Sequence, residues 1–292
     1  GATMRNSKYN EKIIRLFAFG LGDGWLQQVG RNRFQLFYSG KITTLLAIKK
    51  ELSEMKINSG ITKEKRILAV YSRKLARHFF KLGFPVGKKS ERDFTIPEWV
   101  FSLNKHLKKE FLRGLFGADG SKPQIKRYTA RNITYTIIKN PSKQKSGVKF
   151  LLQVRELLRE FGINASEHIY KFKQQENIGL RLMIYGEENI IRFIKQVGYL
   201  YDLQKIAHAE QVLRFLERKQ KILQMKKEAM YIILELRKKG WGAKRIHRIL
   251  TKQGFLISLR FVERTLYEHR VRIRIFKSDM LPFEEWIKNG QS

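Results

Sequence analysis

The chain of 292 residues contains no cysteine, so it can form neither a disulfide nor a thiolate metal site. It also has no apolar run of the roughly 20 residues that cross a bilayer. No secretory signal peptide is recognisable, and Gly1-Ala2-Thr3 reads as a cloning scar. We therefore expect a protein of the cytoplasm or nucleoid that is neither secreted nor bound to a membrane.

Acidic side chains are scarce: 26 Asp and Glu stand against 60 Lys and Arg, which gives a net charge of +34. Soluble domains seldom need a net charge above about 8. Lys and Arg that neutralise phosphates release counterions, so a chain of this charge is expected to bind nucleic acid with a strong salt dependence. The composition therefore disfavours a neutral small-molecule partner.

Histidine is also rare, with six residues in the whole chain. They are His78, His106, His168, His208, His247 and His269. None of them falls into a metal-binding spacing such as H-E-x-x-H. The sequence thus argues against a zinc or histidine-metal nuclease.

One phrase occurs twice: Leu16-Phe-Ala-Phe-Gly-Leu-Gly-Asp23-Gly24 returns as Leu112-Arg-Gly-Leu-Phe-Gly-Ala-Asp119-Gly120. Each copy reads as an apolar, small-residue helix that ends in Asp-Gly. A single copy would be typical of a packing helix with a glycine cap. Two copies, 119 − 23 = 96 residues apart, instead predict two similar halves around a pseudo-two-fold axis. Close approach of the two helices is expected at Ala18, Gly20, Gly22, Gly114, Gly117 and Ala118.

Both phrases resemble the signature of LAGLIDADG homing endonucleases. In that family two such helices pack side by side, and the aspartate at each base holds a divalent metal over DNA. The resemblance covers roughly residues 8 to 210 and identifies the chain as similar to a single-chain, two-motif member. It implies a monomer that cuts both strands of a long, asymmetric DNA site, leaves short 3′ overhangs and serves intron homing.

Phosphodiester hydrolysis needs positive charge at the attacking and leaving oxygens, which metal ions supply. Asp23 and Asp119 are the expected metal ligands, and the backbone carbonyls of Gly22 and Ala118 could complete each shell. Mg²⁺ prefers such oxygen donors and keeps several waters. We expect Mg²⁺ as cofactor, with Mn²⁺ able to substitute.

The resemblance also implies basic residues around the metals. Lys122 follows Asp119 by three residues, whereas its counterpart in the first half is the apolar Leu26, so the two sites are not chemically identical. Lys41 resembles another basic residue of the family. The glutamine that usually neighbours that residue is replaced by Gly40 here. The expected catalytic lysines are Lys41, Lys89, Lys122 and Lys205, of which Lys89 and Lys205 occupy matching places in the two halves.

Hydrophobic periodicity predicts the same order of elements in both halves. In the first half we expect, after the helix that delivers Asp23, strands over 25–29, 33–38 and 66–71 and helices over 41–55 and 72–82. In the second we expect strands over 124–129, 132–139, 165–170 and 180–185 and helices over 147–161 and 187–197. The fold class is α+β, with an N-terminal arm over 1–6, one half over 7–105 and the other with its exit helix over 106–222.

The strands carry cations and amides with no acid among them. The expected DNA contacts in the first half are Gln28, Arg31, Arg33 and Gln35, and those in the second are Gln124, Lys126, Arg127, Arg131, Thr134 and Thr136. Arg and Gln can each grip a base edge with two hydrogen bonds in the major groove. The resemblance implies an antiparallel sheet from each half along that groove.

Residues 223–292 are expected to form a separate all-α module. Three short helices, over 230–237, 243–252 and 258–269, with a turn near Gly254 predict a helix-turn-helix. The string from Gly242 to Val262 resembles the DNA-binding domains of resolvases, with Ser258 as the cap of the recognition helix. Expected DNA contacts there are Arg260, Arg264, Tyr267, Arg270 and Arg272.

Two other functions stay open at this point. The chain could be a transcription regulator on an inactive endonuclease fold, although the intact Asp23 and Asp119 argue against that. It could also be an intron maturase that binds its own intron RNA, alone or alongside cleavage. An intein origin is disfavoured, because neither a flanking splicing domain nor a splice-junction cysteine is present.

Overall fold

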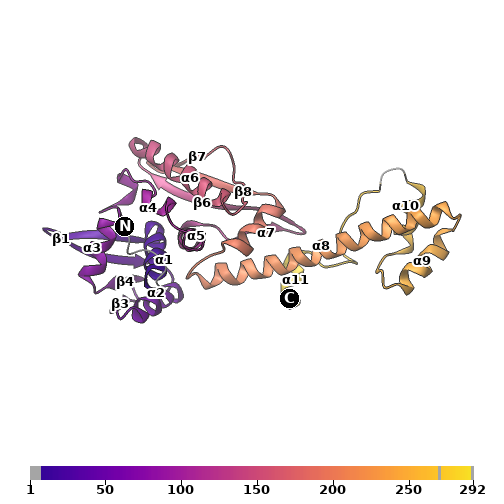
Figure 1. Cartoon of the computed structure of the whole chain (residues 1–292), viewed down its shortest axis with the longest axis horizontal. Helices are drawn as coiled ribbons and strands as arrows, with labels where there is room; N and C mark the ends of the chain where they lie inside the picture. The colour runs from indigo at the N-terminus through magenta and orange to yellow at the C-terminus, as the bar shows by residue number, and fades with distance from the viewer. Residues whose placement is uncertain (1–7, 269–270, 291–292) are drawn as a thin grey trace. The chain divides into compact units, whose positions relative to one another are not determined.

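The computed structural model describes residues 8–268 and 271–290, and Gly1-Ala2-Thr3 and Arg270 lie outside them (Figure 1). The chain divides into two compact units. The core unit holds the chain up to residue 124 together with 130–210, and the C-terminal unit holds 125–129 together with the chain from residue 211 onward. Among the described residues, no helix combines the length and the apolar composition that crossing a membrane requires.

The core unit contains two successive sets of elements. The first set is α1 (Lys8–Asp23), β1 (Gly24–Gly30), β2 (Arg33–Ser39), α2 (Ile42–Glu54), β3 (Ser59–Thr62), β4 (Ile67–Val70), α3 (Arg73–Lys81), the 3-10 turn η2 (Lys89–Glu91) and α4 (Glu98–Phe101). The second is α5 (Lys105–Asp119), β5 (Gln124–Lys126), β6 (Thr129–Lys139), the 3-10 turn η3 (Pro141–Lys143), α6 (Gln144–Arg159), β7 (Tyr170–Gln174), β8 (Asn177–Tyr185) and α7 (Glu187–Gln196). The C-terminal elements are α8 (Leu203–Lys238), which starts in the core unit, α9 (Ala243–Lys252), α10 (Leu259–Tyr267) and α11 (Phe283–Lys288).

The two sets form sheets of the same topology. The strand order is β1-β2-β4-β3 in the first and β5-β6-β8-β7 in the second. The β1–β2, β2–β4 and β3–β4 pairs of the first sheet are antiparallel, as are β6–β8 and β7–β8 of the second. The internal duplication predicted from the repeated phrase is thereby confirmed at the level of the fold.

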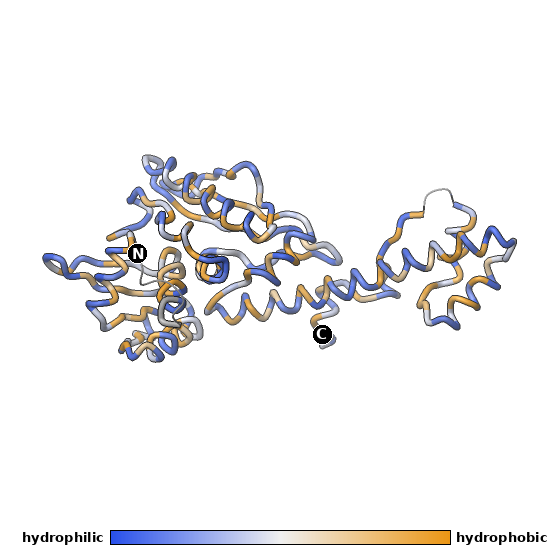
Figure 2. The backbone as a smooth tube through the Cα atoms, in the orientation of Figure 1, coloured by the Kyte–Doolittle hydropathy of each residue, from blue (hydrophilic) through white to orange (hydrophobic). Residues whose placement is uncertain are grey.

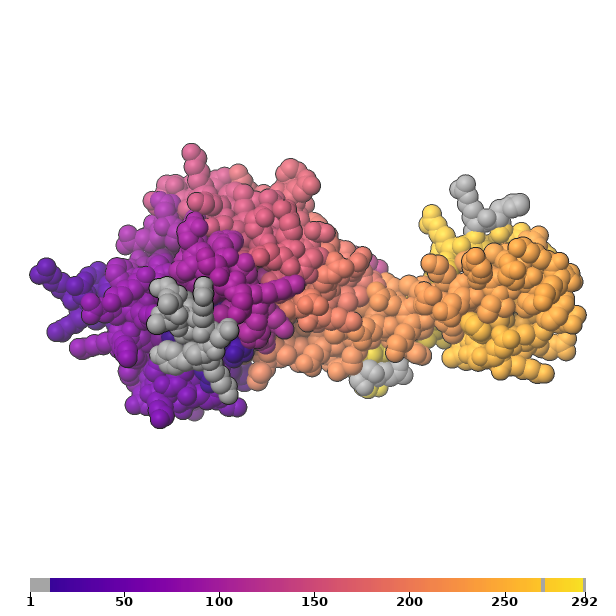
Figure 3. Space-filling model, in the orientation of Figure 1, coloured from indigo at the N-terminus to yellow at the C-terminus, as the bar shows by residue number. Residues whose placement is uncertain are grey.

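Helices α1 and α5 pack against each other between the two sheets (Figure 1). In the stretches that lead to the final Asp, side chains on nearly every face of both helices are buried, and the tube of α1 is largely white to orange in Figure 2. Asn104 caps α5 by accepting from the backbone N–H of Leu107 at 2.9 Å. The pair is the central layer of the core unit. Figure 3 shows that residues of both halves lie on the surface of this unit.

Three details differ from the sequence predictions. Strand β3 was not predicted, since Ser59–Thr62 is too short and polar to show alternation. The strand expected over 165–170 is wrong, because only Ala165 forms an isolated bridge and β7 begins at Tyr170. The helix expected over 230–237 is the end of α8, so the expected boundary at residue 222 falls inside a continuous helix.

In the C-terminal unit, the end of α8 packs with α9 and α10 around a small apolar core. Its buried members are Ile233, Ile246, Leu250, Val262 and Leu266. Gly254, with φ +90, turns the chain between α9 and α10. Ser258 caps α10 by accepting from the N–H of Phe261 at 3.1 Å, as predicted.

Candidate active site

The two repeated phrases meet through small residues, as predicted. A Cβ on Gly114 would lie 2.7 Å from that of Ala18, and one on Gly22 would lie 2.4 Å from that of Ala118. Members of each pair are equivalent positions, because 114 − 18 and 118 − 22 both equal 96. Each level of the crossing therefore has room for one methyl group, and this close approach brings the two helix ends together.

Two other glycines expected at the helix crossing, Gly20 and Gly117, do not serve it, which corrects the expectation for them. A Cβ on Gly20 would meet the ring of Phe84 at 3.0 Å, and one on Gly117 would meet the carbonyl oxygen of Leu200 at 2.1 Å. Phe84 and Leu200 lie in the segments that leave the two halves. Gly20 and Gly117 thus let these exit segments pack directly on the helices.

Asp23 and Asp119 are the last residues of α1 and α5 and lie close enough to repel each other. Burial raises the pKa of Asp23 to about 7, and the charge of Asp119 adds to that rise. Burial likewise raises the pKa of Asp119 to about 6. The pair is a half-buried, oxygen-rich and electrostatically strained donor set, which fits a hard divalent cation between or beside the carboxylates.

Lys89 closes the end of the first helix. Its ammonium donates to the carbonyl oxygens of Gly20, Leu21 and Gly22 at 2.9, 2.8 and 2.9 Å. A cation at a helix C-terminus satisfies carbonyls that have no partner within the helix. Burial lowers the pKa of Lys89 to about 8, although the nearby Asp119 and Asp23 act in the opposite direction.

Lys205 closes the end of the second helix in the same way. Its ammonium donates to the carbonyl oxygens of Gly117 and Ala118 at 3.0 and 3.2 Å. Burial lowers its pKa, while Asp202, Asp23 and Asp119 oppose that shift. The structure therefore places Lys89 and Lys205 at matching positions beside the two acids. The carbonyls of Gly22 and Ala118 were expected as metal ligands. Each accepts a hydrogen bond from one of these ammonium groups and retains a second lone pair.

Separate contacts hold each lysine in place. In the first half, the N–H of Gly87 donates to the carbonyl of Leu26 at 2.9 Å. Lys139 then donates to the carbonyls of Lys89 and Arg92, both at 2.9 Å. In the second half, Asp202 accepts from the N–H of Lys205 at 3.1 Å. Lys139 was not predicted, because nothing in a strand pattern distinguishes an inward lysine from an outward one.

The remaining predicted lysines differ in their surroundings. Lys41 hydrogen-bonds to Gln204, which belongs to the first turn of α8. A glutamine therefore does accompany Lys41, but it comes from a segment 163 residues away rather than from position 40. Lys122 is exposed, and its counterpart Leu26 is fully buried. Gln204 could not be found from local spacing, since only the fold brings it to Lys41.

A hollow of about 640 Å³ opens beside Asp23. Its lining comes from β1, the neighbouring Ser39, and the exit segment of the first half that carries Lys88, Lys89 and Arg92. It combines the carboxylate with three cationic side chains, so it suits a phosphate near a metal ion.

The open face of the first sheet is defined by strand register. Cross-strand partners share a face, and Gln27 pairs with Gln35 while Gln28 pairs with the buried Phe34. Gln35 therefore lies on the open face, together with Arg33, two residues earlier on the same strand. Gln28 falls on the opposite face but is exposed, so its DNA contact stays a prediction, and Gln27 shares the open face with Gln35.

The open face of the second sheet includes the predicted Thr134 and Thr136, which alternate with the buried Ile133 and Tyr135. Arg181 donates to the hydroxyl of Thr136 at 3.1 Å. It lies opposite Tyr170 on β7, and the ring of Phe172 is 4.7 Å from its guanidinium carbon. The sequence missed this cation because β8 otherwise reads as a buried strand. The other predicted contacts are exposed: Arg31, Gln124, Lys126, Arg127 and Arg131.

In the C-terminal unit, Arg260 and Tyr267 are exposed on α10, with Tyr267 at 74%. Arg264 pairs with Glu268 at 3.3 Å, so its charge is partly neutralised within its own helix. Arg272 is exposed after the end of α10. The predicted contact Arg270 lies outside the described residues.

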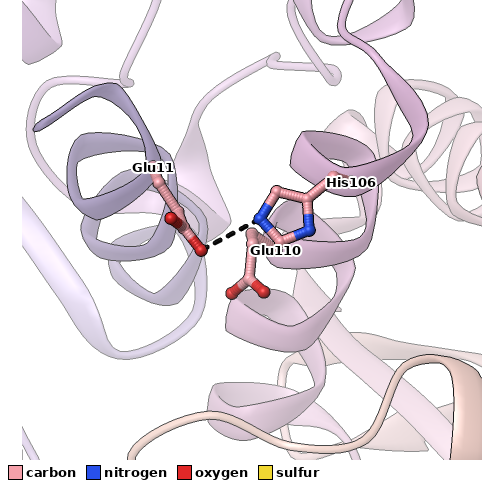
Figure 4. A group of neighbouring side chains, drawn as sticks. All are labelled: Glu11, His106 and Glu110. Carbon is pink, nitrogen blue, oxygen red and sulfur yellow. Dashed lines mark hydrogen bonds and ion pairs between the residues drawn. The ribbon is translucent and has the colours of Figure 1, made fainter. Parts of the chain in front are cut away.

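A second cluster of ionisable groups lies near the starts of α1 and α5 and contains Glu11, His106 and Glu110 (Figure 4). His106 contacts Glu11 at 3.1 Å. Arg15 donates to Glu11 and Glu110 at 2.7 and 2.6 Å, and Arg113 donates to Glu110 at 2.8 Å. Two guanidinium groups already neutralise these carboxylates and would repel a metal ion, so the cluster joins the helices as an ion-pair network.

Comparison with known proteins adds a family for part of the chain. Residues 106–198 match the family model of the LAGLIDADG-like domain. The second half is thus similar to a LAGLIDADG-like domain. The first half repeats the sheet topology and the acidic helix end of the second, so the core unit consists of two halves of the same fold, and C-terminal helices follow them.

Curated relatives have different names. The chain is 32% identical over 294 residues to the tRNA-splicing ligase RtcB of Pyrococcus furiosus, covering 94% of this chain and 30% of that protein. It is 30% identical over 213 residues to the replication factor C small subunit of Methanocaldococcus jannaschii, covering 67% of this chain and 11% of that protein. The RNA polymerase subunit Rpo1N of that organism is 26% identical over 243 residues, with 74% and 18% covered. The chain thus spans under a third of these relatives.

Two solved structures are also similar. I-DmoI in complex with DNA and Ca is 18% identical with a TM-score of 0.44, covering 68% of this chain and 97% of that one. The LAGLIDADG meganuclease I-AabMI, bound to uncleaved DNA, is 14% identical with a TM-score of 0.42, covering 72% and 92%.

Proposed function

We propose that the chain is a site-specific DNA endonuclease that makes a double-strand break in a long, asymmetric target and leaves short 3′ overhangs. The observation that carries the proposal is the pair of half-buried carboxylates, Asp23 and Asp119, at the ends of two equivalent helices. Each acid would serve one strand. The net charge of +34 supports a polyanionic partner.

Asp23 and Asp119 would hold the divalent metal, with the carbonyls of Gly22 and Ala118 as further oxygen donors. Bound Mg²⁺, or Mn²⁺ in its place, would supply Lewis-acid activation of water and neutralise charge on the scissile phosphate. Lys89 and Lys205 fix the helix ends and place positive charge beside the acids. Lys41 and Lys122 would contact phosphate or orient water, with Gln204 fixing the ammonium of Lys41.

The DNA would lie along the open faces of both sheets. In the first half Gln27, Arg33 and Gln35 would reach base edges or phosphates. In the second, Thr134, Thr136 and Arg181 would do the same, with further contacts from the exposed residues around both hairpins. One chain contains both halves, so it would act as a monomer on a target without symmetry.

We further propose that α8 to α10 provide a second DNA contact of the helix-turn-helix kind. The apolar core around Val262 and the cap at Ser258 support a stable three-helix module. Arg260 and Tyr267 would enter a groove, with Arg264, Arg272 and Arg270 toward the backbone. This contact would add affinity outside the central site.

The relatives favour an origin as a protein insert over the intron origin expected from the sequence. A ligase, a replication factor subunit and a polymerase subunit have no named activity in common. In each of these relatives, the segment that matches this chain is less than a third of the relative's length. We propose that the shared segment is a mobile intein-encoded element. Expressing the full reading frame and analysing the products by mass spectrometry tests this. Excised chain with joined flanks supports an intein, and removal at the RNA level supports an intron.

The endonuclease is tested by incubating the protein with a randomised target library, with and without Mg²⁺, and sequencing the ends. Discrete, metal-dependent ends with short 3′ overhangs are expected. Tight selection of a sequence without cleavage under any metal would overturn the enzyme and favour the regulator or the maturase.

A further inference from the structure

The tip of the β5–β6 hairpin belongs to the C-terminal unit, not to the core unit that contains its strands. Arg127 forms the turn in the left-handed region, with φ +56. Its carbonyl accepts from the N–H of Phe283 at 2.8 Å, and its own N–H donates to the carboxylate of Glu284 at 3.0 Å. Both backbone groups of the turn residue are therefore bonded to the start of α11, more than 150 residues further along the chain.

The next residue of the turn is held from two sides. The hydroxyl of Tyr128 donates to the carbonyl of Met280 at 2.9 Å. Its carbonyl accepts from Lys219 on α8 at 2.8 Å. The two elements that hold Tyr128, α8 and the segment before α11, are thus bridged by the hairpin tip.

An aromatic cluster supports these hydrogen bonds. Phe215 on α8 stacks with Tyr128 at 6.3 Å between ring centroids and meets Phe283 and Trp286 edge-on at 5.3 and 5.4 Å. Phe215, Phe283 and Trp286 are all buried. Burial of three aromatic side chains anchors the end of the chain far more firmly than the polar contacts alone.

In the part of the chain that the structure describes, the equivalent hairpin of the first half has no such support. Strands β1 and β2 pair over their whole length, from Gly24 with Tyr38 to Gly30 with Arg33. No hydrogen bond joins its tip, Arg31 and Asn32, to another segment within the described part of the chain. Strand β5 has only three residues, so the second hairpin has less pairing of its own and relies on the C-terminal contacts.

We infer that the tail from Phe276 to Lys288 is a positioning element for the second hairpin and thereby determines specificity for one half of the DNA target. The inference rests on the proposed DNA binding. Lys126 and Arg127 are exposed on the held tip, and a loop fixed before binding loses less entropy when DNA arrives. Glu284 is the positioning residue, because it is the acceptor for the Arg127 N–H. The hydrogen bond from Arg127 holds the pKa of the Glu284 carboxyl below its usual range.

The test compares Glu284→Ala with Glu285→Ala, which removes the same charge from the same helix but only an exposed ion pair with Lys277. Hydrogen exchange reports on the Arg127 amide without DNA. Loss of one hydrogen bond is worth about 1 kcal/mol, so exchange should accelerate by roughly fivefold in Glu284→Ala. Glu285→Ala and Glu284→Gln, which keeps an acceptor, should leave it near the wild-type rate.

Specificity is measured by selecting binding sites from a randomised library. Positions read by each half are assigned with Arg33→Ala for the first and Thr136→Ala for the second. Glu284→Ala should relax preference only at the second set. Unchanged exchange and unchanged preferences, or equal relaxation at both sets, would overturn the inference. Wild-type protein that selects no sequence would instead refute the proposed function, while the exchange rates would still decide whether the tail holds the tip.

Discussion

Asp23 and Asp119 show how two ordinary carboxyl groups become unusual through placement alone. Each is half-buried at a helix C-terminus, where the helix dipole is itself negative. Their raised pKa values mean that the folded protein binds protons more tightly than the unfolded chain does. The pair stores unfavourable electrostatic energy at neutral pH that a divalent cation would relieve.

This placement predicts a pH dependence of stability in EDTA. Because the folded pKa values, about 7 and about 6, exceed the ordinary Asp value of 3.8, stability is highest below pH 4 for these groups and falls as pH rises toward 7. Each pKa unit corresponds to about 1.4 kcal/mol, and residual solvent access reduces the total to about 1–3 kcal/mol. Thermal unfolding from pH 4 to 8 should show Asp23→Asn gaining stability over wild type as pH rises. A constant difference between the two proteins would contradict this prediction.

At the scale of residues, the sequence predicts the acids and the lysines Lys89 and Lys205, because a repeated motif marks the first and matched spacing marks the second. Lys139 and Gln204 escape prediction because long-range contacts alone give them a role. Gln27 also escapes prediction, since strand alternation does not say which face a strand turns to the core.

At the scale of elements, the α1–α5 crossing depends on having one methyl group per level. An alanine inside a helix normally stabilises it relative to glycine by about 0.5–1 kcal/mol. At Gly114, however, the new Cβ would also lie 2.9 Å from the carbonyl oxygen of Arg15, so the helices must separate.

Gly114→Ala should therefore destabilise the protein by about 1–3 kcal/mol in urea unfolding. Ala18→Gly in the same chain should restore part of the loss, because it removes the nearer contact at 2.7 Å. Neutral or stabilising behaviour of Gly114→Ala would show that the two backbones are further apart than described.

Most elements can be predicted from hydrophobic periodicity and helix caps. Where the prediction fails, the failure has a physical reason. Ser72 and Gly83 delimit α3 as expected, because the serine accepts from the N–H of Leu75 and the glycine adopts φ +98. The segment 165–170 is apolar at only some positions, and its pairing depends on the partner strand β8. Helix α8 continues through residues 222–230 because no proline or glycine interrupts it.

At the scale of the whole molecule, chain division and sequence order do not coincide, since residues 125–129 group with the C-terminal unit. A truncation near Gln220 would remove α11 as well as α9 and α10. It would thus disturb the second hairpin in addition to the helix-turn-helix-like module. Point substitutions separate the two effects better than truncation does.

The combined change Arg260→Ala/Tyr267→Ala should weaken DNA binding by about thirtyfold or more, since each good base or phosphate contact is worth about 1–3 kcal/mol. Cleavage at saturating DNA, and the position of the cut, should stay as in wild type. Gel-shift titration and single-turnover cleavage measure the two properties. A slower cut at saturation would show that α10 takes part in the chemistry, against the proposed division of roles.

The central claim is that Asp23 and Asp119 perform metal-dependent cleavage, and one measurement tests it most directly. On a target selected from the library, binding and cleavage are compared for wild type, Asp23→Asn, Asp119→Asn and the double variant in Mg²⁺. We predict near-normal binding throughout, with double-strand cleavage lost in each single variant and all cleavage lost in the double variant. Full cleavage by the double variant would contradict the account.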